Sequence, residues 1–184
     1  MHSATHAGTS PQVPEVPNEE LRTRPGRIVV GVDGSSGADA ALSWAAAQAR
    51  EHGLVLDIVA AWEDIADEDS PYSRQQAARS RVERALESLG RRRLLPGEVI
   101  TAPLHGPTGE QLIARAHGAG MLVLGTTGIS SPREPHSLGL YCLRHTPIPV
   151  VFVPPEPSQQ HVVDSRHGGS DPDAGTAGRE ASTT

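Results

Sequence analysis

Two glycine-bearing loops carry the residue types and the spacing that could do chemistry in this chain. The first loop, GVDGSSG (31–37), follows the apolar run RIVV, and the second, which opens with GTTG (125–128), follows MLVL. Glycines placed directly after a strand let backbone N–H groups come close to a phosphate. Both loops are therefore candidates for an anion-binding site. For Gly34 and Gly37, a tight strand-to-helix turn is the alternative.

The pattern around these loops favours binding over catalysis. Asp33 stands in the first loop, where it either caps the following helix or contacts a ribose or a metal-bound phosphate. The glycines do not fit G-x-G-x-x-G, and a chain without lysine has no Walker-type phosphate loop. His105 and His136 are expected as polar loop residues at the same end of the sheet. No nucleophile–base pair stands out, so we expect no catalytic residue and no metal ligand.

Five short apolar runs alternate with segments of helical periodicity. Each run is predicted to be a buried strand, and the runs are 27–33, 54–62, 98–104, 121–125 and 148–154. This order predicts an α/β fold in which helices cover both faces of a parallel sheet. Ligands of such sheets bind beyond the carboxyl ends of the strands, where the strand order reverses. The two glycine loops are expected to meet there.

Local signals predict where the helices begin and end. Ser35 and Ser36 are candidate N-caps of the first helix, and Gly53 is expected to end it. Thr108 and Gln111 have the spacing of a capping box. The run Arg91-Arg92-Arg93 is predicted to lie at a helix C-terminus, where cations oppose the helix dipole.

Composition separates a folded centre from two polar ends. Residues 1–26 and 155–184 are rich in proline, glycine, serine and acidic residues, so we predict disordered tails around a domain at 27–154. The net charge of −6 argues against a nucleic-acid partner or a membrane partner. The single cysteine, Cys142, excludes an intramolecular disulfide and predicts a buried thiol in a cytoplasmic protein.

With these residues in place, the chain resembles the universal stress protein family. The matching pieces, in family order, are RIVVGVDGSSGADAALSWAAAQA, LDIVAAW, HGPTGEQLIARA, AGMLVLGTTG and LRHTPIPVVFV, which together span 27–154. The resemblance implies a single-domain, three-layer, doubly wound sheet of Rossmann-like type, with five parallel strands in the order 3-2-1-4-5. It also implies a homodimer formed through the last strand.

The resemblance further implies an adenine-nucleotide site that takes ATP together with Mg²⁺. In the members that bind ATP, a Gly-x-x-Gly pair and a later Gly-Ser or Gly-Thr wrap the phosphates. The aspartate of the first strand lies near the adenosine, and the second strand lines the adenine. By position in this chain, the expected binding residues are Val32, Asp33, Ala61, Gly125, Gly128, Ser137 and Leu138.

The second loop departs from the pattern of the ATP-binding members. Those members place nine residues between the second glycine and Gly-Ser, whereas here seven residues (129–135) precede His136-Ser137. Two missing residues remove up to ~7 Å of reach. Pro132 and Pro135 also remove two N–H donors. The expected ATP-binding motif is therefore degenerate.

We expect a stress-response regulatory protein that binds ATP weakly and does not hydrolyse it efficiently. The alternative is a nucleotide-free dimeric interaction module with a protein partner still to be identified. A slow ATPase is the third hypothesis.

Overall fold

The computed structural model of the chain describes residues 17–21, 26–64, 70–126 and 138–155. Gly128, Ser137 and most of the two predicted tails lie outside these residues. In chain order the elements are α1 (Asn18–Leu21), β1 (Arg27–Gly31), α2 (Ser36–His52), β2 (Val55–Trp62), α3 (Pro71–Arg91), β3 (Glu98–His105), α4 (Thr108–Ala116), β4 (Met121–Gly125), α5 (Leu138–His145) and β5 (Val150–Val153).

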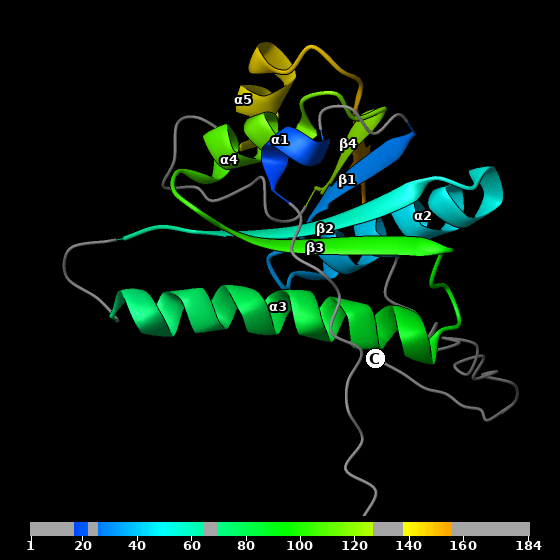
Figure 1. Ribbon diagram of the computed structural model, residues 1–184, viewed down its shortest axis with the longest axis horizontal. Coiled ribbons are helices and arrows are strands. Elements are labelled where there is room, and N and C mark those ends of the chain that lie inside the picture. Colours follow the sequence, from blue (N-terminus) through cyan, green and yellow to red (C-terminus); the bar gives the residue numbers. More distant parts are fainter. Residues whose placement is uncertain (1–16, 22–25, 65–69, 127–137, 156–184) are drawn as a thin grey trace, which may run out of the picture.

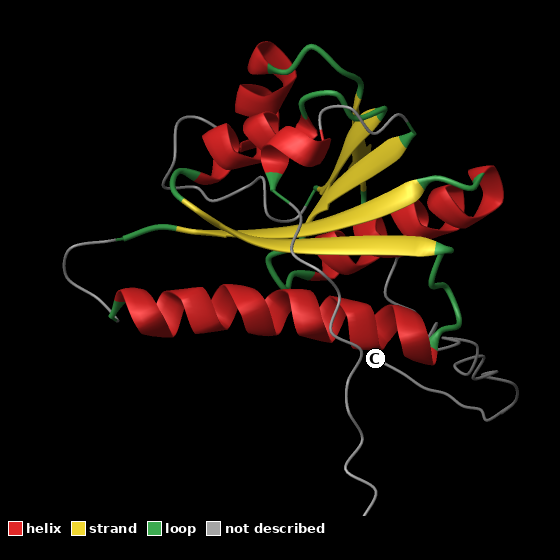
Figure 2. Ribbon diagram, viewed as in Figure 1, coloured by secondary structure: helices red, strands yellow, loops and turns green. Residues whose placement is uncertain are grey.

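The five strands form one parallel sheet in the order β3-β2-β1-β4-β5. Helices α2 and α3 cover one face, and α1, α4 and α5 cover the other, which gives three layers (Figures 1 and 2). Strand β1 lies at the centre, where Val30 pairs with Ile58 of β2 and with Val123 of β4. The predicted fold class and strand order are confirmed.

Each face of the sheet has its own apolar core. On the side of α2 and α3, the helical residues of the core include Ala41, Leu42, Ala45, Ala49, Ala78, Val82, Ala85 and Leu89. These are the positions that a period of 3.6 residues places on one face of each helix. On the side of α4 and α5, the core includes Leu112, Ala116, Leu122 and Cys142.

Cys142 of α5 is a buried thiol, as predicted from the sequence. The residue has no exposed surface, and burial raises the pKa of the thiol from 9.0 to about 11. Removal from water disfavours the charged thiolate, so the neutral thiol predominates at physiological pH.

Helix α2 begins and ends where its sequence predicts. The Ser35 hydroxyl accepts a hydrogen bond from the Ala38 N–H at 3.2 Å, and Gly53 ends the helix with a φ of 64°. Helix α3 ends at Arg91 with Arg92 as its C-cap, which confirms the cationic C-terminus. The predicted capping box of α4 is wrong, because Thr108 is the first helical residue and the N-cap is Pro107, which makes no side-chain cap.

The predicted N-terminal tail contains a short helix, α1, that packs on the domain. Leu21 has no exposed surface, and the Asn18 carboxamide oxygen accepts a hydrogen bond from Arg115 Nη1 at 2.9 Å. Burial of a leucine side chain stabilises the segment by about 1.5–3 kcal/mol, which offsets part of the entropy of ordering it. For residues 17–21 the prediction of disorder is therefore wrong.

Below α1, a buried ion cluster joins β1, β2 and α4. Asp57 Oδ2 accepts hydrogen bonds from Arg27 Nη1 at 2.7 Å and from Arg115 Nε at 2.8 Å, while Oδ1 accepts from Arg115 Nη2 at 3.0 Å. Arg27 and Asp57 are 0% exposed and Arg115 is 2% exposed. Arg27 also donates to the carbonyls of Arg115 and His117, which binds the C-terminal end of α4 to the start of β1. Burial lowers the pKa of the Arg27 guanidinium, and the Asp57 carboxylate opposes that shift.

None of the helices within the described residues combines the length and the apolar composition that crossing a bilayer requires.

Candidate functional site

A cavity lies at the carboxyl ends of β1 and β4, where the strand order reverses. The chain leaves β1 for α2 on one face of the sheet and leaves β4 for α5 on the other (Figure 1). The cavity has a volume of about 240 Å³, close to the lower limit of small-molecule sites. Its described lining residues are Gly31, Val32, Asp33, Ser35, Ala38, Val59, Ala61, Arg81, Thr108, Leu112, Leu124, Gly125 and Leu138.

The cavity brings together five residues that were predicted from the sequence to form the site. They are Val32, Asp33, Ala61, Gly125 and Leu138. The other two, Gly128 and Ser137, lie outside the described residues. Gly125 at the end of β4 and Leu138 at the start of α5 both line the cavity.

Asp33 holds the turn between β1 and α2. Its Oδ1 accepts a hydrogen bond from the Ser35 N–H at 2.8 Å, and the residue is exposed. Between them, Gly34 has a φ of 88°, a left-handed conformation that favours glycine. The side chain of Asp33 therefore stabilises the turn and does not cap α2. Ser35 is the N-cap of α2, as predicted.

Gly125 allows the end of β4 to come against the first turn of α2. A Cβ atom at this position would overlap the backbone of Gly37 and the backbone nitrogen of Ala38. No larger residue fits without a backbone shift. The contact sets the N-terminus of α2 beside the cavity, where the positive end of the helix dipole favours an anion.

The N-terminus of α4 also reaches the cavity, but a carboxylate already occupies it. Glu63 Oε1 accepts hydrogen bonds from the Thr108 N–H at 2.7 Å and from Thr108 Oγ1 at 3.3 Å. Glu63 comes directly after β2 and so caps α4 from another element. This contact replaces the local capping box, and nothing in the sequence near Thr108 indicates it.

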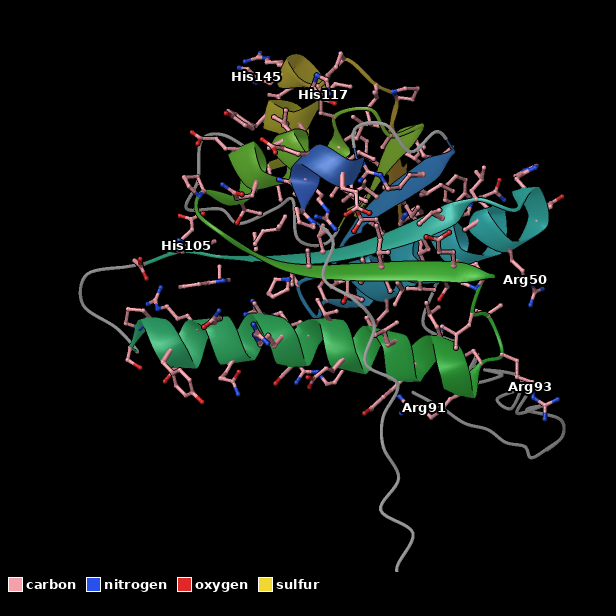
Figure 3. All side chains as sticks on the ribbon, in the orientation of Figure 1. Arg50, Arg91, Arg93, His105, His117 and His145 are labelled. Atoms are coloured by element: carbon pink, nitrogen blue, oxygen red, sulfur yellow. The ribbon has the colours of Figure 1, made fainter. Side chains whose placement is uncertain are left out.

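His105, predicted as a loop residue, is instead the last residue of β3, and it is absent from the described lining of the cavity. His105 Nε2 is 2.9 Å from Asp64 Oδ2, and the imidazole packs on Trp62 with ring centroids 4.2 Å apart. Figure 3 shows His105 at the end of the sheet opposite Arg50, Arg91 and Arg93. His136 lies outside the described residues.

Comparison with known proteins identifies the family. The sequence profile of the universal stress protein family matches residues 25–154, which is most of the chain. The chain belongs to the universal stress protein family. No curated protein sequence matches it.

Several solved structures with the same fold are named as universal stress proteins. One from Burkholderia pseudomallei is 24% identical, with a TM-score of 0.54 over 70% of this chain and 96% of that structure. One from Archaeoglobus fulgidus, in complex with dAMP, is 19% identical, with a TM-score of 0.54 over 69% and 96%. One from Arabidopsis thaliana, with AMP bound, is 15% identical, with a TM-score of 0.50 over 73% and 97%.

Within its described lining, the cavity of this universal stress protein holds one carboxylate and one cationic side chain. Asp33 is the only carboxylate among the described lining residues, and no three metal-ligating side chains converge anywhere in the described part of the chain. Arg81 of α3 is the only cation in the described lining. Arg81 was not among the residues predicted from the sequence, although its place beside the buried positions Ala78 and Val82 indicates that it borders the core.

Proposed function

We propose that this universal stress protein is a regulatory protein whose cavity binds an adenine nucleotide, with weakened affinity for ATP and no efficient hydrolysis. The observation that carries the proposal is the convergence of the β1 loop, the end of β4 and the N-terminus of α2 on one cavity. Family members crystallised with cAMP, dAMP and AMP support the choice of ligand class.

We assign the described lining residues to the base, the ribose and the phosphate of the nucleotide by their chemistry. Val32 and Ala61 offer apolar surface to the base, and Asp33 offers a carboxylate to the ribose hydroxyls. The backbone near Gly125 and the N-terminus of α2 face the phosphate. Mg²⁺ would enter with the triphosphate. The weakening for ATP is argued from the shortened segment 129–135 of the sequence.

A binding role without efficient turnover follows from the same donor set. General-base activation of water requires a carboxylate or imidazole that is available to accept a proton. In the proposed complex Asp33, the one carboxylate in the described lining, accepts the Ser35 N–H and the ribose hydroxyls, so no further carboxylate of the described lining is available as that base. We place this function in the cytoplasm, the usual setting for a protein with one reduced cysteine.

Calorimetric titration of the purified full chain with AMP, and with ATP and Mg²⁺, tests the proposal. Nucleotide carried through purification is measured beforehand by denaturation and chromatography. We expect saturable binding that Ala61→Leu weakens at least about tenfold, because the larger side chain fills part of the cavity and tenfold corresponds to about 1.4 kcal/mol. Ala77→Leu, the same change at an exposed position of α3, is the matched control and should leave binding unchanged.

Absence of binding at millimolar nucleotide, with none co-purified, would contradict the proposal. That outcome would favour the alternative, a nucleotide-free dimeric interaction module. One observation supports it: β5 is an edge strand whose four apolar residues, Val150–Val153, are each only partly buried in a single chain. Pairing of this edge with a second copy would cover them, and sedimentation analysis measures the resulting mass.

A further inference from the structure

Arg81 is a cation that borders the cavity and has no partner in the described part of the chain. It lies on α3 next to the buried residues Ala78 and Val82, is itself partly buried, and lines the cavity together with Val32 and Asp33. No hydrogen bond or ion pair joins its guanidinium to the described residues. A partly buried guanidinium without a partner favours an anionic ligand beside it.

Among the described residues, several other arginines are engaged elsewhere in the domain. Arg27 and Arg115 bind Asp57 inside the domain, and Arg74 donates to the backbone carbonyl of Glu63 at 2.8 Å. Arg50 and Arg93 lie at the opposite end of the sheet from His105 (Figure 3), where Arg50 donates to the Arg93 carbonyl.

The helix termini do not replace Arg81 as a full positive charge. The N-terminus of α4 is already neutralised by the Glu63 carboxylate, which accepts the Thr108 N–H. The N-terminus of α2 carries only a partial charge, equivalent to about half an elementary charge. With a net charge of −6, the chain as a whole repels an anion, so a cation in the described lining favours anion binding locally.

We propose that Arg81 binds the phosphate of the nucleotide and sets the preference of the site for nucleotides over nucleosides. This inference rests on the proposed nucleotide-binding function and assigns to Arg81 one part of it. A guanidinium presents several N–H donors in one plane, which matches the oxygens of a phosphate. Because Arg81 lies on α3, its contact with the phosphate does not depend on the shortened segment 129–135 after β4.

The test compares AMP with adenosine in wild-type protein, Arg81→Gln, Arg81→Lys and Arg84→Gln. Arg84 is exposed on the same helix and does not line the cavity, so Arg84→Gln removes the same charge as a matched control. We expect Arg81→Gln to weaken AMP binding by roughly tenfold to a hundredfold, the range for a charged hydrogen bond, and adenosine binding by less than about twofold. Arg81→Lys should retain part of the AMP affinity, and Arg84→Gln should retain all of it.

The affinities for AMP and adenosine test the role of Arg81 separately from the proposed function. Unchanged AMP affinity in Arg81→Gln overturns the role of Arg81 and leaves the proposed function standing. Equal losses for AMP and adenosine overturn the assignment to phosphate. A wild-type protein that binds neither ligand contradicts the proposed function and this inference together. Melting temperatures of the variants show that each is folded, which we expect because Arg81 has no partner to lose among the described residues.

Discussion

Asp57 and Glu63 lie at opposite ends of β2, and each carboxylate joins elements that are distant in the sequence. Asp57 is fully buried between two arginines, where β1, β2 and α4 meet. Glu63 is only partly buried and caps α4 at the edge of the cavity. The first contact holds the domain together, and the second shapes a site that stays open to solvent. The fully buried charges thus lie toward the start of β2, away from the cavity.

The largest effect should come from Asp57→Asn. This change leaves Arg27 and Arg115 buried without a negative charge, and breaking a buried pair in this way costs about 3–5 kcal/mol. Chemical denaturation with urea measures the loss in the free energy of unfolding. A loss below about 1 kcal/mol would mean that the cluster contributes no more than a surface ion pair.

Leu21→Ala should have an intermediate effect on the same end of the domain. Removal of a buried leucine side chain costs about 2–5 kcal/mol, and we expect the lower value because α1 is a short peripheral helix. Leu95→Ala, at a leucine that is 46% exposed, is the control and should change stability by less than about 0.5 kcal/mol. Equal effects of the two substitutions in urea denaturation would show that α1 does not pack on the domain in solution.

The smallest effect should come from Glu63→Gln, the counterpart of Asp57→Asn at the cavity end. The glutamine retains an oxygen that accepts the Thr108 N–H, so only the charge at the N-terminus of α4 is lost. Such a charge contributes about 0.3–1 kcal/mol. Urea denaturation measures the loss in the free energy of unfolding. A loss as large as that of Asp57→Asn would show that Glu63 contributes as much to stability as the buried Asp57.

The fold could be predicted from the sequence because its signals are local. The five apolar runs, the alanine stripe of α2, the Ser35 cap and the Gly53 terminus each depend on neighbouring residues. The meeting of the two glycine loops then followed from the general position of ligand sites in parallel sheets. Val32, Asp33, Ala61 and Gly125, which the resemblance to the family implied by position, line one cavity.

The parts that could not be predicted depend on contacts between residues far apart in the chain. The partners of Asp57 are Arg27 and Arg115, and no spacing rule relates these three positions. The cap of α4 comes from Glu63, so the local pair at Thr108 and Gln111 was misleading. The sequence did hold one usable signal: an aspartate inside an apolar strand is rarely buried without a partner.

The environment of Cys142 also lowers the reactivity of its thiol toward oxidants. Peroxides and disulfides react with the thiolate, and a pKa of about 11 leaves only about one thousandth of the thiol ionised at pH 8. The side chain is also closed off from solvent. Both features slow sulfenic acid formation, glutathionylation and disulfide cross-linking between copies at the chain's one cysteine. We therefore expect this thiol to stay reduced under peroxide while the domain is folded.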